Sequence, residues 1–559
     1  MRRDDILGLM PRLSRWFPFL HWPRPDAALL RGEFAAALTV AMVLVPQSVA
    51  YAALAGMPLV TGLYASLLPL VIAVLFGAST RLSTGPSALT SVLVGASLLG
   101  MAAPGSSEWV ALAVWLALLS GGIQLALGAA GAAWVLNLVS SPVLAGFTQA
   151  AALLIMASQL PALLGLEGGL GSMLSGPQFD YVAMGYGVGS IVLFVLGKRF
   201  LPRVPMVLLV LAAAGALSKW SGYAEHGAVI GTLPVGLPSF YWPGFPAWEN
   251  FGALLVPALV ITLVSSLEMA SSAKIESQRE GKRWEASQDL VGQGLSKLAS
   301  AFSGSFPTSG SFSRSAITLY AGAKTGWATV ITGAVVLLVL LFLTPVLQPV
   351  PLAALAAVVV VAVAGLVKPS TLPRLWRIDR VEAVTALVTF SVTLLSAPRI
   401  YWGVLVGVLL GLAHFLYLRL HPRIIEVGLH PDGSMRDRHL WKLPPLGAQV
   451  YALRMDAELD FASASALERA VVEHVAAHPG TRHVCLFAHP INRVDTTGVE
   501  VFMRLRSVLR DRGIALHVTG LKLPVETVLR KAGALDESPL MHMYRTDSEA
   551  LSALGRVAS

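Results

Sequence analysis

The stretch GSFPTSGSFSRSA, residues 304–316, places hydroxyl groups and one full charge between two long apolar stretches. Ser311 and Ser313 can donate hydrogen bonds without adding fixed charge, and Arg314 adds a guanidinium group. An arginine inside a membrane span costs at least ~2.5 kcal/mol on insertion scales, so it should face a partner or a water-filled cavity. We therefore expect Arg314 to attract an anion, to neutralise a carboxylate such as Glu268, or to have only a structural role.

A second polar stretch, STGPSALTSVLVG (residues 83–95), has the same character. Like PTSGSFSRSAITLYAG (residues 307–322), it places proline, glycine and hydroxyl residues at the start of an apolar helix too short to span a bilayer. Paired interrupted segments of this kind indicate a transporter site at the midplane of an inverted repeat. Half-helix N-termini that face each other present unpaired N–H groups and positive dipole ends, so together with Ser87 they predict an anion site. The alternative is that both stretches only cap their helices.

One carboxylate, Glu268 in ITLVSSLEMASSAK, is expected inside a span. Burial disfavours the charged form of a carboxyl group, so a buried glutamate can take up and release a coupling proton. Ser272 lies one helical turn further along on the same face and is a second candidate for ion coupling. The alternative is a glutamate at a helix end beside Lys274.

The first apolar segment contains VLVPQSVAYAALAGMP, with polar groups at membrane depth. Pro46 interrupts the helix and frees backbone carbonyls, while Gln47 and Tyr51 add side-chain hydrogen-bonding groups. These residues are candidates for the same site. The alternative is that Pro46 is only a kink and Tyr51 only an interfacial aromatic residue.

The composition of the chain indicates what kind of helices position these residues. The chain has 559 residues, of which 55% are hydrophobic and only 13% charged, about half the charged share of a soluble domain. Apolar stretches of roughly 20 residues recur, each long enough to cross a bilayer, so we predict an α-helical polytopic membrane protein. The formal charge of +9 lies mostly beside these stretches, which indicates membrane topology rather than a nucleic-acid partner.

Fourteen hydrophobic segments are predicted. In chain order they cover residues 32–56, 57–79, 85–102, 107–134, 142–165, 183–201, 204–218, 249–273, 284–303, 308–322, 325–346, 350–366, 379–397 and 400–420. Basic residues gather after the even-numbered segments, whereas the loops after odd-numbered segments contain only Lys219 and Arg399. The even loops and both termini are therefore expected in the cytoplasm, and the protein in the plasma membrane (the inner membrane of a bacterium) with lipid around it.

The sequence changes character near residue 440. AQVYALRMDAEL alternates like a strand and ASASALERAVVEHVAAH has a helical period, so strands and helices alternate as in a small α/β domain. This region has no Cys/His metal spacing, no GxSxG and no P-loop, and we expect no enzyme activity, cofactor or metal. The predicted domains are a cytoplasmic N-terminal segment (1–31), a transport domain (32–421), a linker (422–439) and a cytoplasmic α/β domain (440–559).

Together these motifs resemble the SulP sulfate-permease family of anion transporters, which is related to the mammalian anion exchangers that include prestin. The resemblance rests on VPQSVAYAALAGMPLVTGLYAS, STGPSALTS and GSFPTSGSFSRSA, and the C-terminal region resembles that family's STAS domain. It implies a seven-plus-seven inverted repeat, divided into core and gate bundles, with the substrate between the facing N-termini of the third and tenth spans. It also implies an elevator-like movement of the core and a homodimer.

The resemblance also assigns roles to residues. Ser87, Ala88, Ser313 and Arg314 match anion-site positions, and Gln47 and Tyr51 match core-site positions. Glu268 matches an acidic position that holds a coupling ion or shapes the site, and because sodium-coupled bicarbonate members have Asp there, Glu favours protons over sodium. Thr496 falls where bacterial anti-sigma-factor antagonists carry a phosphorylated residue, a role often absent in transporters; helix capping by Asp495 and Thr496 explains the motif by itself.

The expected function is proton-coupled transport of a small anion, sulfate or a similar oxyanion. Bicarbonate or a C4-dicarboxylate on the same scaffold is the nearest alternative, because dipoles and hydroxyls discriminate poorly among small oxyanions. Sodium coupling stays open as well. Two further alternatives are an uncoupled anion channel and a membrane sensor that signals through the C-terminal domain.

Overall fold

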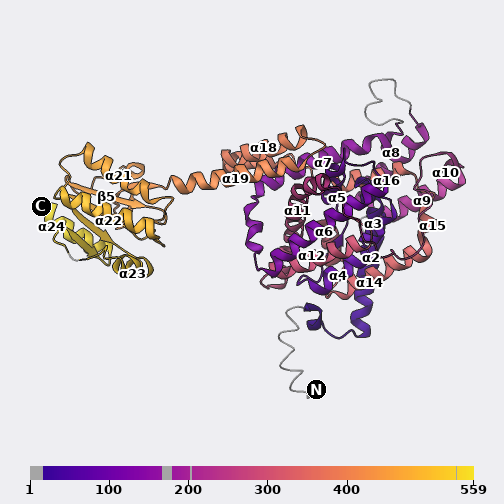
Figure 1. The fold of residues 1–559 in the computed structure, drawn as a ribbon, viewed down its shortest axis with the longest axis horizontal. Helices are drawn as coiled ribbons and strands as arrows, with labels where there is room; N and C mark the ends of the chain where they lie inside the picture. The colour runs from indigo at the N-terminus through magenta and orange to yellow at the C-terminus, as the bar shows by residue number, and fades with distance from the viewer. Residues whose placement is uncertain (1–16, 167–178, 202–203, 537, 559) are drawn as a thin grey trace, which may run out of the picture. The chain divides into compact units, whose positions relative to one another are not determined.

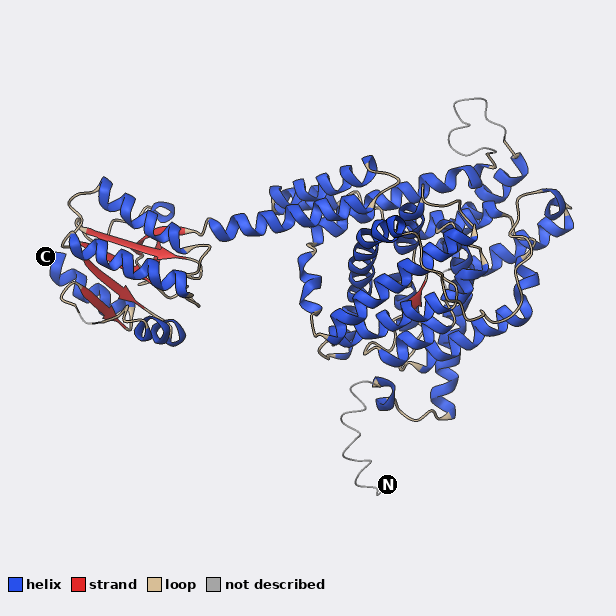
Figure 2. Cartoon of the chain, viewed as in Figure 1, coloured by secondary structure: helices blue, strands red, loops and turns tan. Residues whose placement is uncertain are grey.

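The computed structural model describes residues 17–166, 179–201, 204–536 and 538–558 (Figure 1). The N-terminal part of the predicted segment 1–31 therefore lies outside the described residues as far as residue 16. The chain divides into two compact units, Met1–Gly411 and Leu412–Ser559. The first is helical and the second contains a sheet (Figure 2).

All fourteen predicted segments are helical in the structure. They are α2 (Ala27–Leu54), α3 (Val60–Ala65) with α4 (Leu68–Phe76), α5 (Ala88–Leu98), α6 (Ser107–Ala129), α7 (Ser141–Leu164), α8 (Tyr181–Phe200), α9 (Met206–Trp220), α11 (Trp248–Glu280), α12 (Ala286–Phe302), α13 (Phe312–Tyr320), α14 (Trp327–Leu338) with α15 (Thr344–Leu347), α16 (Leu352–Ala364), α18 (Arg380–Leu395) and α19 (Tyr401–Leu420). Within the described residues, seven helices are long and apolar enough to cross a bilayer by themselves. The short element η1 (Pro18–His21) precedes the first segment, and the π-helical turn η4 (Val339–Leu343) joins α14 to α15. Three more short elements, η2 (Ala133–Leu138), α10 (Tyr223–His226) and α17 (Thr371–Ile378), lie between segments.

The order of the segments repeats. The first seven, α2 to α9, and the last seven, α11 to α19, each have a short third member, α5 and α13. Both short helices begin after an extended stretch instead of another helix, because proline and glycine interrupt the helical hydrogen bonds there. The structure therefore has the predicted seven-plus-seven arrangement.

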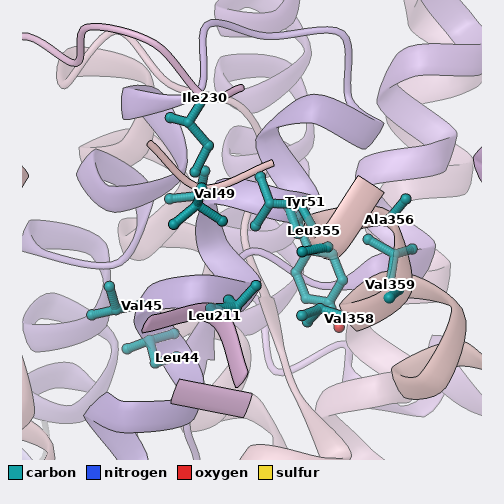
Figure 3. Close-up of a cluster of buried hydrophobic side chains, with 14 of the residues drawn as sticks. Leu44, Val45, Val49, Tyr51, Leu211, Ile230, Leu355, Ala356, Val358 and Val359 are labelled. Atoms are coloured by element: carbon teal, nitrogen blue, oxygen red, sulfur yellow. The ribbon is translucent and has the colours of Figure 1, made fainter. Parts of the chain in front are cut away.

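The helices pack into two bundles. In the core bundle, α12 packs against α6 and α4, α11 against α5 and α6, and α14 against α2 and α4. In the gate bundle, α16 and α18 pack against α7, and α8 packs against α7, α9 and α16. A large buried apolar cluster connects the two bundles, with Leu44 and Tyr51 of α2, Leu211 of α9, and Leu355 and Val358 of α16 (Figure 3).

Of the helix boundaries that differ from the prediction, two lie beside the polar stretches. Helix α11 continues to Glu280, whereas the predicted segment ends at residue 273, so Lys274 and Arg279 belong to the helix and not to a loop. Helix α13 begins at Phe312, because Ser309 and Gly310 form a strand. Both differences follow from hydrogen bonds to distant parts of the chain, which local hydropathy does not report.

The second unit is built on a six-stranded sheet in the order β4-β3-β5-β6-β7-β8. Its strands are β3 (Ile424–Leu429), β4 (Met435–Asp437), β5 (Val450–Met455), β6 (His483–Phe487), β7 (Ala515–Thr519) and β8 (Met541–Tyr544), and its helices are α20 (Arg438–Trp441), α21 (Ala464–Ala477), α22 (Thr496–Asp511), α23 (Leu523–Lys531) and α24 (Asp547–Ala558). Strands β5 to β8 are parallel, as the alternation of strands and helices predicts. The segment 422–439, predicted as a linker, is instead part of this sheet, because β3 pairs with both β4 and β5.

Candidate functional site

The starts of the two half-helices, α5 and α13, are joined by a short antiparallel ladder. Strand β1 (Thr84–Gly85) pairs with β2 (Ser309–Gly310), with Thr84 opposite Gly310 and Gly85 opposite Ser309. A Cβ atom on Gly85 would lie 3.3 Å from Nη2 of Arg314, so glycine allows the guanidinium to approach the backbone. The ladder therefore brings together two segments far apart in the sequence, as the paired polar stretches predict.

Glu268 of α11 lies at this meeting point. Its Oε2 atom accepts hydrogen bonds from Ser309 Oγ at 2.6 Å, Ser87 Oγ at 2.9 Å and Thr90 Oγ1 at 3.4 Å. Because α11 continues for three more turns to Glu280, Glu268 is not a helix-end residue. The carboxylate thus connects both half-helices to the middle of α11.

Arg314, the third residue of α13, is fully buried, with 0% of its surface exposed. Its Nε donates to Ser83 Oγ at 3.4 Å, while Nη1 and Nη2 have no hydrogen-bond partner among the described residues. Among the described residues, no carboxylate oxygen lies within 4 Å of the Arg314 guanidinium. A direct ion pair with Glu268, one of the roles expected for Arg314, is therefore not seen. Its charge acts on Glu268 and on Tyr51 through space.

The remaining anion-site candidates lie around the helix starts. Ser87 is the N-cap of α5, accepts from Thr90 N at 3.3 Å and precedes the buried Ala88. Ser311 is the N-cap of α13, but its side chain caps no backbone N–H and instead lies 3.4 Å from the hydroxyl of Ser313. Ser313 is exposed.

Gln47 and Tyr51 are both buried in α2, which continues past Pro46. The side-chain oxygen of Gln47 has no hydrogen-bond partner among the described residues. Tyr51 lies in the apolar cluster beside Leu355 of α16, where the core and gate bundles meet (Figure 3). Both residues thus lie on the core side of this contact, and Tyr51 lies within the field of the charged site.

The structure does not bring Ser272 to the carboxylate of Glu268. Its hydroxyl donates to the main-chain oxygen of Glu268 at 3.2 Å, a bond within the helix. It instead lines a cavity of about 150 Å³ together with Arg81, Glu276 and Ser315. Ser272 is therefore a residue of this cavity and does not contact the Glu268 carboxyl group.

Three polar partners of the site were not singled out from the sequence. Thr90 and Ser309 donate hydrogen bonds to Glu268. The closely spaced hydroxyl residues within STGPSALTS and GSFPTSGSFSRSA were the sequence feature that could have identified them. Lys297 of α12 is fully buried and donates to Ser265 Oγ at 2.6 Å. Its signal was a single lysine in the middle of a predicted span.

Other buried carboxylates hold loops instead of forming the site. Asp289 accepts from the backbone N–H groups of Ala78 and Ser79, each at 2.8 Å, and Glu276 accepts from Thr80 N at 3.0 Å. Glu33 accepts four hydrogen bonds from residues 324–328, at the start of α14. Each carboxylate satisfies backbone donors that would otherwise be buried without partners.

In the second unit, Thr496 is the first residue of α22 and is exposed. Asp495 caps this helix by accepting from Gly498 N at 2.8 Å, and it also accepts from Phe461 N at 2.9 Å. Capping thus fully accounts for Asp495, whereas modification of Thr496 stays a prediction. Among the described residues no group of three or more His, Cys, Asp or Glu side chains is arranged to hold a metal ion.

Comparison with known proteins identifies the family of the chain. Residues 30–389 match the model of the sulfate permease family, and residues 447–550 match the STAS domain. A probable sulfate transporter of Mycobacterium tuberculosis is 32% identical over 94% of this chain and 96% of its own length. A probable sulfate transporter of Arabidopsis thaliana is 30% identical over 90% of this chain and 78% of its own length.

Solved structures share the fold. The murine solute carrier 26 family member A9 anion transporter, in its inward-facing state, matches with a TM-score of 0.86 and 21% identity over 100% of this chain and 95% of its own. The transmembrane domain of the cyanobacterial bicarbonate transporter BicA matches with a TM-score of 0.58 and 19% identity over 69% of this chain and 98% of its own. The chain is an integral multi-pass membrane protein that belongs to the sulfate permease family, a family of transporters and not of enzymes, and it carries a C-terminal STAS domain.

Proposed function

We propose that the chain is a proton-coupled transporter of small oxyanions, with sulfate as its main substrate. The anion binds between the N-termini of α5 and α13, and Glu268 takes up and releases the coupling proton. The observation that carries this proposal is the Glu268 carboxylate, which accepts hydrogen bonds from Ser87 at the start of α5 and from Ser309 in the strand before α13.

Anion binding is supported by free donors at the start of α13. Ser311 makes no side-chain cap, so the first N–H groups of this helix keep the partial positive charge of an uncapped N-terminus. Arg314 adds two guanidinium nitrogens without partners among the described residues. Planar N–H donors of this kind suit the oxygens of sulfate, bicarbonate or a carboxylate.

Proton coupling is supported by the type of group around Glu268. Ser87, Thr90 and Ser309 contribute hydroxyls, which can donate to an ionised carboxylate or accept from a protonated one. The same side chains can therefore satisfy both protonation states without a rearrangement of the backbone. Sodium coupling remains the alternative, and gradients of the two cations distinguish them.

For alternating access we propose an elevator-like movement of the core bundle against the gate bundle. All the site residues belong to the core bundle, so they would move together. The contact between the bundles includes apolar side chains such as Val49, Tyr51 and Leu355, which tolerate sliding because dispersion contacts are not directional (Figure 3).

In the remaining parts of the proposal, the topology follows the charge pattern of the sequence and the oligomeric state follows the family resemblance. Both termini and the STAS domain lie in the cytoplasm of a plasma membrane, the inner membrane in a bacterium, and two copies form a homodimer. The STAS domain has a regulatory, assembly or docking role, in which Thr496 is available at the surface.

The proposal is tested by uptake into proteoliposomes of labelled sulfate, bicarbonate and succinate, under imposed proton and sodium gradients. We expect sulfate to accumulate above its external concentration when a proton gradient is applied and not when a sodium gradient is applied. Accumulation of bicarbonate or succinate without accumulation of sulfate would identify that anion as the substrate. Equilibration without accumulation under both gradients would indicate an uncoupled channel.

A further inference from the structure

We propose that Lys297 is the third charge of the anion site and that it determines the charge of the anion that the site accepts. Together with Arg314 and Glu268, it makes the protonated site select a dianion and the ionised site a monoanion. This inference rests on the proposed function, because it assumes that the anion binds at the half-helix starts and that Glu268 takes up the proton.

Lys297 cannot move its ammonium group to water. It is fully buried in α12, with 0% of its surface exposed. Its Cβ would lie 2.9 Å from a Cβ added to Gly121, and the Gly294 carbonyl oxygen would lie 3.0 Å from the same added atom. Because a glycine at this contact lets α6 and α12 approach so closely, the lysine side chain is enclosed between helices and does not reach a membrane surface.

The ammonium group has few partners for its charge. Among the described residues it donates one hydrogen bond, to Ser265 Oγ at 2.6 Å, although an ammonium can donate three. Among the described residues no carboxylate oxygen lies within 4 Å of its Nζ. A buried ammonium with one neutral partner is poorly compensated, which is costly unless another negative charge acts on it.

Ser265 connects Lys297 to the anion site. It lies on α11, one turn before Glu268, and its main-chain oxygen is 3.4 Å from the hydroxyl of Ser309. That same hydroxyl donates to Glu268 Oε2 at 2.6 Å. Lys297 is therefore separated from the Glu268 carboxylate by two serines, and Glu268 is the charged group whose field acts on it.

The ionisable groups that face the site come from four helices. They are Tyr51 of α2, Glu268 of α11, Lys297 of α12 and Arg314 of α13. Of the other helices packed around them, α4, α5, α14 and α16 contribute no ionisable side chain. Helices α3, α6 and α9 contribute only the half-buried Tyr64, the exposed Glu108 at the far end of α6 and the exposed Lys219. The charge of the site therefore depends on two cations and one carboxyl group.

This balance makes the proton and a dianion bind together. When Glu268 is ionised, the three groups sum to one positive charge, which a monoanion such as nitrate or bicarbonate compensates. When Glu268 is protonated, they sum to two positive charges, which sulfate compensates. By linkage, the bound proton then increases the affinity for the dianion, and the bound dianion increases the affinity for the proton. Without Lys297 the two sums become zero and one, so the site should favour monoanions.

The test compares uptake of labelled sulfate and labelled nitrate into proteoliposomes at acidic and neutral pH. The variants are Lys297→Met, which removes the charge, and Lys297→Arg, which keeps it. We expect Lys297→Met to lower the ratio of sulfate to nitrate uptake at least about tenfold, because one uncompensated charge is left with the bound dianion. Lys297→Arg should keep the ratio within about threefold of wild type.

A second pair of variants keeps the proposal testable if Lys297→Met alone does not fold. Glu268→Gln removes the carboxyl group and leaves Lys297 and Arg314 as the cationic groups, so it should prefer sulfate to nitrate at acidic pH. The double variant Glu268→Gln with Lys297→Met loses a cation and its counter-charge together, and should prefer nitrate at every pH. An unchanged sulfate-to-nitrate ratio between these two, or between folded Lys297→Met and wild type, would overturn the role of Lys297.

The same measurements separate this inference from the proposed function. If Glu268→Gln keeps the pH dependence of wild-type uptake, the coupling role of Glu268 is wrong and the inference fails with it. If Glu268→Gln becomes independent of pH while removal of the Lys297 charge leaves the ratio unchanged, the proposed function stands and only the inference fails.

Discussion

Ser309 donates a 2.6 Å hydrogen bond to Glu268 Oε2, so the strand before α13 is tied to the middle of α11. Ser87 at the start of α5 donates to the same oxygen at 2.9 Å. One carboxylate thus contacts both halves of the repeat at the place where their short helices begin. Because an anion between these helix starts would lie beside this carboxylate, the protonation of Glu268 and the binding of the anion should influence each other.

Glu268→Gln should make sulfate uptake independent of pH while sulfate still binds. The amide is neutral at every pH and can keep hydrogen bonds to the surrounding hydroxyls. Uptake by proteoliposomes over a range of external pH measures this effect. The matched control is Glu249→Gln on the same helix, whose side chain is exposed and should leave the pH dependence unchanged. A wild-type pH profile in Glu268→Gln would refute the coupling role.

Ser309→Ala should weaken sulfate uptake and shift its pH profile. It removes the shortest donor to Glu268, and a hydrogen bond to a charged group contributes about 1.5–3 kcal/mol. We expect a loss of roughly tenfold or more in uptake at neutral pH. Ser271→Ala is the control, because its hydroxyl is exposed and bonds only to the Leu267 main chain. Equal effects of the two substitutions would contradict a specific role for Ser309.

Ser313→Leu should abolish sulfate binding because a large apolar side chain at the second position of α13 would cover the first N–H groups of the helix. Ser313 is exposed, so the substitution should be tolerated by the fold. Binding of labelled sulfate to the purified protein checks the prediction, with Ser271→Leu on α11 as a control of similar size and exposure. Near-normal binding by Ser313→Leu would mean that the anion site lies elsewhere.

Arg314→Ala should weaken sulfate affinity by about tenfold or more, with a smaller effect on the yield of folded protein. The reason is that both terminal nitrogens of its guanidinium lack partners among the described residues, whereas only Nε contacts Ser83. Arg314→Lys, which keeps the charge and loses the planar donors, should recover only part of the affinity. Loss of folded protein with normal affinity in the remainder would indicate a structural role.

The STAS domain should lose stability on acidification through His517. This side chain is buried in β7, its Nε2 lies 3.1 Å from His483 Nδ1 and its Nδ1 lies 3.1 Å from the Tyr544 hydroxyl. Burial, followed by the neighbouring His542 and His483, lowers the pKa of His517 from 6.5 to about 4. Since the folded state resists protonation, its stability is full above the unfolded pKa of 6.5 and falls as the pH decreases toward about 4.

Hydrogen exchange of the full-length protein measures this loss. Exchange of the β7 amides should increase between neutral pH and about pH 5, after correction for the intrinsic pH dependence of exchange. His517→Gln should remove that increase, because its amide does not titrate. A corrected exchange rate in wild type that stays constant across this interval would contradict the prediction.

Hydropathy was sufficient to find the long spanning helices, because each must cover the thickness of the hydrocarbon layer with apolar residues. The two half-helices were also predictable, since proline, glycine and serine at the start of STGPSALTS and GSFPTSGSFSRSA interrupt helical hydrogen bonding. The end of α11 at Glu280 was not, because Glu276 is satisfied by the distant residues Thr80 and Arg81. The strands β3 and β4 were missed for a similar reason, as a short strand is recognised by its partner more than by its own sequence.

The sequence predicted which residues lie at the site better than it predicted which of them contact each other. Glu268, Ser87 and Arg314 lie at the meeting point of the half-helices, but the distance of Arg314 from any carboxylate depends on the course of the β1–β2 ladder. Lys297 was not identified as a site residue because a single lysine in an apolar segment forms no repeating pattern. Its burial results from the close contact between α6 and α12, which involves residues about 175 positions apart.

The most direct test of coupling follows the proton itself. Proteoliposomes that contain the protein and a pH-sensitive dye are given sulfate outside, and the internal pH is recorded together with uptake of labelled sulfate. The account predicts that the interior acidifies as sulfate enters through the wild-type protein, and that the Glu268→Gln variant transports or binds sulfate without acidification. Sulfate entry through the wild type without acidification, or equal acidification with Glu268→Gln, would contradict it.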